Sequence, residues 1–186
     1  MSTKREQIIQ TTCQLIELQG YHATGLNQII AESGAPKGSL YHYFPEGKDE
    51  LVEEAIDHTS RLIAGRLRAA MAATADPAAA IPAFLQQLAH HVQASGFQAG
   101  GPITAVAIEA ASTNPRLNAA CRRAYRSWQA VVEQKLLASG CEAVRARRRA
   151  GVVIALIEGA IILSRSERNV APLLDAATEL AGLLGT

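Results

Sequence analysis

The sequence predicts an all-α protein. Apolar residues recur at spacings of three and four along the chain, which is the helical period, and no useful length alternates with the period of two that a strand requires. Gly and Pro positions break this pattern and divide the 186 residues into roughly nine helical segments. The breaks fall at Gly20, Gly34, 45–47, 76–77, 100–102, 114–115, Gly140 and 171–172.

The first three predicted helices are short. The first covers about Lys4–Gln19 and ends at Gly20, because a residue with positive φ is commonly found where a helix stops. Thr24 is a plausible N-cap for the second helix, residues 26–33. Gly34 then allows a tight turn, since glycine tolerates the left-handed conformation.

The third helix follows this turn, with Pro36 at its start, where a missing backbone N–H has no cost. Two short helices joined by such a turn indicate a helix-turn-helix, whose second helix enters the major groove of DNA. Leu40 and Phe44 are four residues apart and can both be buried. The side chains that remain on the outward face are all hydrogen-bond donors: Lys37, Ser39, His42 and Tyr43. A phosphate or base edge could also approach the backbone of Gly38. The alternative is that the aromatic residues at 41–44 only pack a small bundle.

These residues carry a family resemblance. The segment TGLNQIIAESGAPKGSLYHYF, residues 24–44, resembles the DNA-binding signature of TetR-type bacterial repressors without a gap. The segments GLNQII and GAPKGSLYHYFP resemble the LmrA/YxaF-like branch. So does FPEGKDEL, which has one residue more than the usual Phe-x-x-Lys-x-x-Leu pattern. Ile30 stands where most members have Ala, and Gly25 stands where many have Ser or Thr, which removes a possible phosphate contact.

The resemblance implies which side chains contact DNA. Lys37 and Ser39 are the expected contacts to base edges. The expected phosphate contacts are Thr24, His42, Tyr43 and Lys48, and Tyr41 is either a phosphate contact or a packing residue. Lys48 also lies near the start of the fourth helix, where free N–H groups favour phosphate.

Charge gives little support for DNA binding. The whole chain has a net charge of +1, and residues 1–57 contain four basic and nine acidic residues, a net of −5. We therefore expect binding to depend on a few directed contacts from two copies of the chain, with a modest salt dependence for each half-site.

We expect a DNA-binding domain at 1–47 and a domain for ligand binding and dimerisation at 48–186, whose first helix runs from Lys48 to about Ala73. The apolar run at 150–163 has 14 residues and contains Glu158, so it is a buried helix and not a membrane span.

The last two helices carry the dimer prediction. Small residues at spacing four lie on the first of them, and an apolar stripe lies on the second. The resemblance implies that both helices pair with their copies in a four-helix interface, which suits a palindromic operator. The alternative is that they close the chain's own bundle. The residues concerned are Gly151, Ala155, Gly159, Leu173, Ala177, Leu180 and Leu184.

An effector cavity is expected among the middle helices. The resemblance implies that the loop after Phe97, which contains Gly100, Gly101 and Pro102, borders this cavity. Glu109 is an acid in an apolar helix, so we expect it to orient a ligand or another side chain. Each aromatic residue there could instead be an ordinary core residue. The expected lining is Phe84, Leu88, Phe97, Ile108, Glu109, Tyr125 and Trp128.

Other functions have little support. His90 and His91 are adjacent and point about 100° apart on a helix, so we expect no metal site. The cysteines, at 13, 121 and 141, form no CxxC pair and suit a reducing compartment. The basic run 144–150 is a solvated face or, less simply, a second nucleic-acid site. We find no signal peptide, no catalytic triad order and no phosphate loop, and so expect no cofactor and no enzyme activity.

The sequence thus predicts a cytoplasmic, homodimeric regulator that binds a duplex DNA operator and is released by a small apolar or aromatic effector. The branch resemblance implies planar effectors such as flavonoids or drugs. Two alternatives remain open: a pocket enzyme, and a helical interaction module with a vestigial DNA-binding domain.

Overall fold

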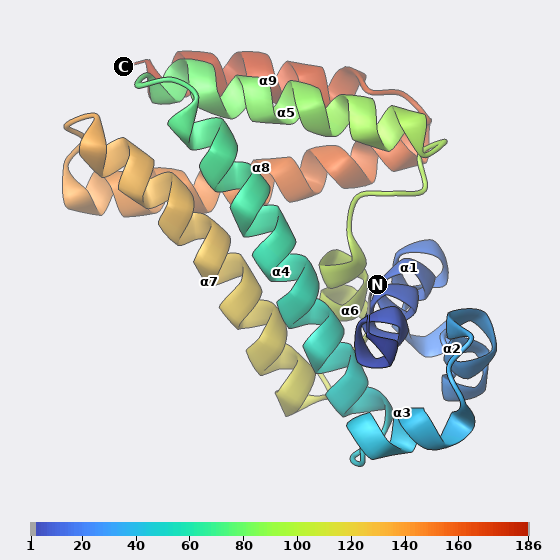
Figure 1. Cartoon of the computed structure of the whole chain (residues 1–186). Coiled ribbons are helices and arrows are strands. Elements are labelled where there is room, and N and C mark those ends of the chain that lie inside the picture. The colour runs from blue at the N-terminus through green and yellow to red at the C-terminus, as the bar shows by residue number, and fades with distance from the viewer. Residues whose placement is uncertain (1–2, 186) are drawn as a thin grey trace. The chain divides into compact units, whose positions relative to one another are not determined.

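The computed structural model describes residues 3–185, which contain nine helices and no strand (Figure 1). The all-α prediction is therefore confirmed. The helices are α1 Lys4–Ala23, α2 Leu26–Ser33, α3 Lys37–Tyr43, α4 Lys48–Ala72, α5 Pro77–Ala94, α6 Pro102–Glu109, α7 Pro115–Ala138, α8 Ala143–Glu167 and α9 Ala171–Leu184.

The helices form two compact units. The first contains the chain up to Arg61 together with residues 101–124, and the second contains residues 62–100 and 125 onward. The helices α4 and α7 each begin in the first unit and end in the second. This division differs from a boundary after residue 47, because α6 and the first turns of α7 belong to the same compact unit as α1–α3.

Apolar side chains from α1 to α4 form the core of the first unit. Leu40 and Phe44 are both fully buried, as the spacing of α3 predicts. The turn before α3 contains Gly34 at φ 62°, where a Cβ would be strained. One buried apolar cluster of the unit consists of Ile8, Ile9, Leu15, Ile29, Ala35, Leu40, Phe44, Leu51 and Ala55.

The helix α1 bends at Gly20, which has φ 84° and ψ 175° and interrupts the helical conformation. The stop predicted at this glycine is confirmed, although one further turn, to Ala23, follows the bend. The predicted N-cap of α2 is wrong. Gly25 occupies that position, and the hydroxyl of Thr24 donates to the carbonyl of Gly20 at 2.7 Å.

In the second unit α5 lies along α9, and α8 contacts both (Figure 1). This arrangement buries the apolar stripe of α9, whose members are at most 6% exposed: Leu173, Ala177, Leu180 and Leu184. The stripe therefore packs within the chain and is not available to a second copy, which corrects this half of the dimer prediction. A spacing of three and four shows that a helix face is buried but not which helix buries it.

Candidate functional site

The outward face of α3 is a row of polar and aromatic side chains on a fixed base. Leu40 and Phe44 bury the opposite face, so the short helix cannot rotate without losing that burial. Tyr41 and Tyr43 remain 46% and 37% exposed, and the rings of His42 and Tyr43 meet edge to face at 5.1 Å. Lys37 and Gly38 are exposed, and Ser39 is half-buried. These are the side chains that the sequence predicts for contacts to DNA.

Two predicted phosphate contacts are engaged inside the chain. Thr24 is fully buried, and its hydroxyl donates to Gly20, so the role of this side chain is structural and the predicted phosphate contact is corrected. The ammonium of Lys48 donates to the Tyr21 carbonyl at 2.6 Å and lies 4.0 Å from the centre of the Tyr21 ring. Burial lowers the pKa of Lys48 below its usual value, although Asp49 and Glu109 oppose this effect.

Arginines of α7 offset the acidic residues near α3. Arg116 pairs with Glu46, in the turn after α3, and with Glu53 on α4. Arg123 contacts Glu53 at 2.8 Å and Asp57 at 3.2 Å. Burial acts to raise the pKa of Glu53, but the hydrogen bonds from both arginines outweigh burial and hold this pKa below its usual value.

The net charge of −5 in residues 1–57 overstates the negative charge around α3, because that stretch of sequence leaves out the arginines of α7. The first compact unit contains eight Lys and Arg residues and ten Asp and Glu residues, a net of −2 and not −5. The arginines come from residues far along the chain, so a window of sequence could not include them. The unit as a whole is close to neutral.

Five of the expected effector residues belong to the second unit. Phe84, Leu88, Phe97 and Tyr125 are half-buried there, and Trp128 is 4% exposed. The rings of Tyr125 and Trp128 meet edge to face at 5.3 Å. The Tyr125 hydroxyl donates to Glu158 on α8 at 3.3 Å. Phe97 adopts a left-handed φ of 65°, which is strained for a residue with a Cβ.

The other two expected effector residues belong to the first unit. Ile108 is 70% exposed, and Glu109 accepts a hydrogen bond from the backbone N–H of His22 at 2.9 Å. The structure therefore assigns Glu109 to a contact with the end of α1. An acid in an apolar helix is expected to have a specific partner, and the partner of Glu109 here is a backbone N–H of the same chain.

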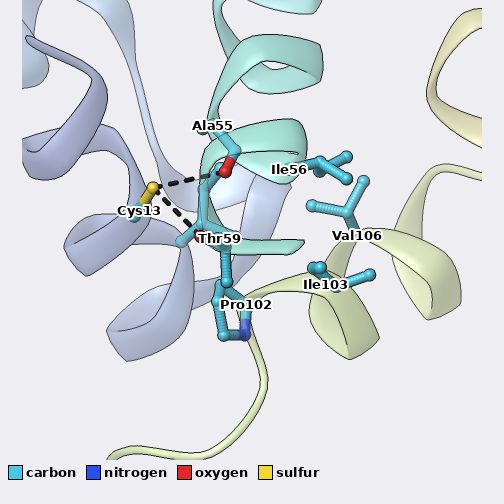
Figure 2. Close-up of a pocket in the computed structure, with 8 residues that line it drawn as sticks. Cys13, Ala55, Ile56, Thr59, Pro102, Ile103 and Val106 are labelled. Carbon is cyan, nitrogen blue, oxygen red and sulfur yellow. Dashed lines mark hydrogen bonds between the residues drawn. The ribbon is translucent and has the colours of Figure 1, made fainter. Parts of the chain in front are cut away.

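A small cavity lies in the first unit, among α1, α4 and α6. Figure 2 shows Cys13 on one side of it, with hydrogen bonds that join the thiol to the carbonyl of Ala55 and the hydroxyl of Thr59. Its volume of about 10 Å³ is close to the room that one water molecule needs, so it does not hold an effector. Of the residues that the sequence places at an effector cavity, only Pro102 lies here, and the full lining is Cys13, Ile16, Ala55, Ile56, Thr59, Pro102, Ile103 and Val106.

Apolar side chains remain exposed on α8 and α9. Val144, near the start of α8, is 63% exposed, and Leu183, at the end of α9, is 41% exposed. The others, at 37–52%, are Val152, Leu156, Ile162, Leu163 and Leu174. Ala155 is exposed on the same face of α8, and Gly159 is half-buried there. A Cβ added at Gly151 or Gly159 would meet no atom of the chain, so packing within the chain does not require these glycines.

The part of the chain from residue 3 to 185 contains no group of three His, Cys, Asp or Glu residues that could hold a metal ion. None of its helices has the length and hydropathy needed to cross a bilayer.

Comparison with known proteins agrees with the geometry of α2 and α3. Residues 8–55 match the N-terminal domain of bacterial regulatory proteins of the tetR family, and residues 77–179 match the C-terminal domain of LmrA/YxaF-like transcriptional regulators. The chain belongs to the tetR family of bacterial regulatory proteins. It is thus a DNA-binding transcriptional regulator of the helix-turn-helix class, in the LmrA/YxaF-like branch.

Relatives in the tetR family align over nearly the whole chain. The HTH-type transcriptional regulator LmrA of Bacillus subtilis (strain 168) is 42% identical over 97% of this chain and 96% of its own length. YxaF of the same organism is 39% identical over 97% of this chain and 94% of its own length. A crystal structure of a TetR transcriptional regulator from Chloroflexus aurantiacus J-10-FL superposes with a TM-score of 0.81 at 29% identity, covering 98% of this chain and 94% of that one.

Sequence reasoning missed the residues that connect the elements of the first unit. Asp49 accepts from the Tyr21 hydroxyl at 2.6 Å and from the side-chain amide of Asn114 at 2.7 Å. Asn114 also caps α7 through the N–H of Arg116. The Asn-Pro pair at the start of α7 signals such a cap, but no local pattern identifies its partner on α4.

Proposed function

We propose that this tetR-family regulator binds a palindromic duplex operator as a homodimer, represses transcription in the cytoplasm, and is released by a small apolar or aromatic effector. The observation that carries the proposal is the outward face of α3. Lys37, Ser39 and His42 supply hydrogen-bond donors beside the exposed backbone of Gly38. The buried side chains of Leu40 and Phe44 anchor the opposite face of the helix in the core. A donor row on a rigid helix suits base edges and phosphates in a major groove.

The same face defines the roles of its residues. Lys37 and Ser39, in the first turn of α3, are the side chains that we assign to base edges. Tyr41, His42 and Tyr43 lie further along the helix and are assigned to phosphates, together with the backbone at Gly38. Lys48 contacts a phosphate only after its ammonium leaves the Tyr21 carbonyl, to which it donates in this structure.

A second copy of the chain supplies the other half-site. The exposed apolar face of α8, from Val152 to Leu163, is the surface that we assign to the dimer, with Leu174 of α9 beside it. Gly151, Ala155 and Gly159 would let a helix of the second copy approach closely. A closed two-fold pair matches an operator whose half-sites are related by the same symmetry.

The effector site is assigned to the second unit. Phe84, Leu88, Phe97, Tyr125 and Trp128 supply half-buried or buried aromatic and apolar surface, and Glu158 supplies a carboxylate next to the Tyr125 hydroxyl. Such a mixture suits a planar aromatic ligand that carries a hydroxyl or amine. The ligand releases DNA only if it binds the DNA-incompetent conformation more tightly than the competent one.

Selection from a random duplex pool tests the central part of the proposal. The purified full-length protein is incubated with the pool at one fixed salt concentration, and the retained duplexes are sequenced. We expect an enriched site with two inverted half-sites about one or two helical turns apart. Enrichment of a single asymmetric site would refute the dimeric reading, and absence of any enriched site would refute operator binding.

A further inference from the structure

The last turn of α1, after its bend, and the residue that follows it lead into α2, and we call this segment, Gly20–Thr24, the elbow. Its backbone enters α2 with only Gly25 between, so the position of the elbow sets where α2 begins. Three side chains from two other helices of the first unit, α4 and α6, contact it. Lys48 donates to the Tyr21 carbonyl at 2.6 Å, Asp49 accepts from the Tyr21 hydroxyl at 2.6 Å, and Glu109 accepts from the His22 N–H at 2.9 Å.

The Glu109 carboxylate fills the space where a side chain at Gly20 would lie. A Cβ built on Gly20 would lie 2.1 Å from Oε1 of Glu109 and 2.9 Å from its Cδ, which is far inside van der Waals contact. Gly20 also has a φ of 84°, in the region that disfavours side chains. The positive φ is the reason that glycine is favoured here, and any Cβ at this position would also displace the Glu109 carboxylate.

The C-terminal ends of α1 and α6 contact each other through His22 and Glu109. Glu109 is the last residue of α6, where backbone carbonyls lack partners within the helix, and the Glu109 carbonyl lies 3.1 Å from Nε2 of His22. The Glu109 side chain in turn accepts from the His22 N–H. A carboxylate at the C-terminus of a helix is unfavourable for that helix, so its position is explained by the elbow and not by α6.

We propose that Glu109 is a positioning residue for DNA reading: it holds the elbow, and through the elbow it fixes α2 and α3 in the conformation that binds the operator. The proposal rests on the proposed function, since it concerns the same DNA-binding face. It makes α6 a direct support of the helix-turn-helix. A movement of α6 that withdraws the carboxylate frees the N–H of His22 and loosens the entry to α2.

The test uses three full-length variants. Glu109→Ala removes the acceptor, Glu109→Gln keeps a side-chain oxygen of the same reach, and Ile108→Ala changes the neighbouring residue, which is 70% exposed and serves as the control. The first readout is hydrogen exchange of the elbow and the start of α2 in the DNA-free protein. The second is affinity for the selected operator, measured well below the unfolding temperature.

We expect Glu109→Ala to speed exchange at the elbow and to weaken operator binding about tenfold, the scale of one lost hydrogen bond to a charged group. Glu109→Gln restores most of both, and Ile108→Ala matches the wild type. A variant Glu109→Ala that unfolds at a lower temperature but keeps wild-type exchange at the elbow and wild-type affinity would overturn the proposal, because Glu109 would then be only a stabilising residue.

The two readouts also separate this inference from the proposed function. If the wild type selects no operator, the proposed function fails, and with it the role of Glu109 in DNA reading. If the wild type binds an operator and the Glu109→Ala protein binds it equally well, the proposed function stands and the inference about Glu109 fails.

Discussion

The hydroxyl of Tyr21 donates to the carboxylate of Asp49 at 2.6 Å, which ties the end of α1 to the first turn of α4. Asn114 donates to the other carboxylate oxygen of Asp49 at 2.7 Å. The carboxylate thus joins α1, α4 and the start of α7, three elements that are far apart in the sequence. The helix-turn-helix is held by residues outside its own segment.

Replacing Tyr21 by Phe removes this bond while it keeps the ring beneath Lys48. We expect the free energy of unfolding to fall by about 1 kcal/mol, the usual size of one hydrogen bond. Chemical denaturation at pH 7 measures this change, and Tyr41→Phe, at an exposed position, is the matched control. Equal stability of the two variants would show that the bond to Asp49 contributes nothing.

The same tyrosine predicts a dependence on alkaline pH. Burial, together with the hydrogen bond to Asp49, raises the pKa of Tyr21 from its ordinary 10.0 to about 12. The folded state therefore favours the neutral phenol, so the stabilisation is complete below pH 10 and is lost as the pH rises towards 12. Ultraviolet titration of the wild type should show one phenol ionising near 12, and Tyr21→Phe should lack this phase. A wild type without such a phase would contradict the prediction.

Glu53 predicts the opposite dependence, at acid pH. Its pKa is held below the ordinary 4.5, because the hydrogen bonds from Arg116 and Arg123 outweigh burial. The folded state favours the carboxylate, so the stabilisation is present above pH 4.5 and is lost as the pH falls through the lowered value. Arg116→Met should cost about 1 kcal/mol at pH 7, since the pair is partly exposed, and less at low pH.

Denaturation curves from pH 2 to 7 measure this difference. Arg122→Met, at an exposed position on the same helix, is the control and should leave the acid limb of the profile unchanged. An Arg116→Met protein that follows the wild type at every pH would show that the ion pairs near α3 carry no stability.

Leu163→Arg tests the surface assigned to the dimer. Leu163 is 52% exposed on the apolar face of α8, and a charge there would be buried without a partner when two copies meet. We expect a monomer in sedimentation experiments at micromolar concentration, with the helical content unchanged. Leu137→Arg, at a 42% exposed position on α7, should remain a dimer. A dimeric Leu163→Arg protein would exclude this face as the interface.

Trp128 is the chain's single tryptophan and belongs to the site that we assign to the effector, so its fluorescence tests that assignment. We expect planar aromatic compounds, such as flavonoids, to quench its fluorescence in a saturable way. Phe84→Ala should weaken this binding about tenfold, as the loss of one aromatic contact does. Gln86→Ala, at an exposed position on the same helix, should bind as the wild type does. Equal affinities for both variants would remove Phe84 from the site.

Local patterns predicted the helices well where the cause is local. Gly20 and Gly34 stop helices because their φ values are positive, and Leu40 and Phe44 are buried as their spacing of four requires. The same patterns could not say what a side chain meets. Thr24 has a side chain that can cap a helix, yet in the folded elbow its hydroxyl donates to the carbonyl of Gly20.

Partners distant in sequence account for the remaining differences. The stripe of α9 was assigned to a second copy, but α5 lies along α9 in the same chain, and an apolar period does not identify its partner. An acid in an apolar helix predicts that Glu109 orients a ligand or another side chain, and in the structure Glu109 accepts from the backbone N–H of His22, 87 residues away. Neither pairing leaves a signal in one sequence.

Titration of the selected operator with the Lys37→Ala protein tests the central claim most directly. The control is Lys4→Ala, an exposed lysine at the start of α1 that we assign no contact to DNA. At one fixed salt concentration we predict an affinity loss of about tenfold or more for Lys37→Ala, the size of one good base contact, and wild-type affinity for Lys4→Ala. Equal affinity of the two variants would contradict the assignment of α3 as the helix that reads DNA.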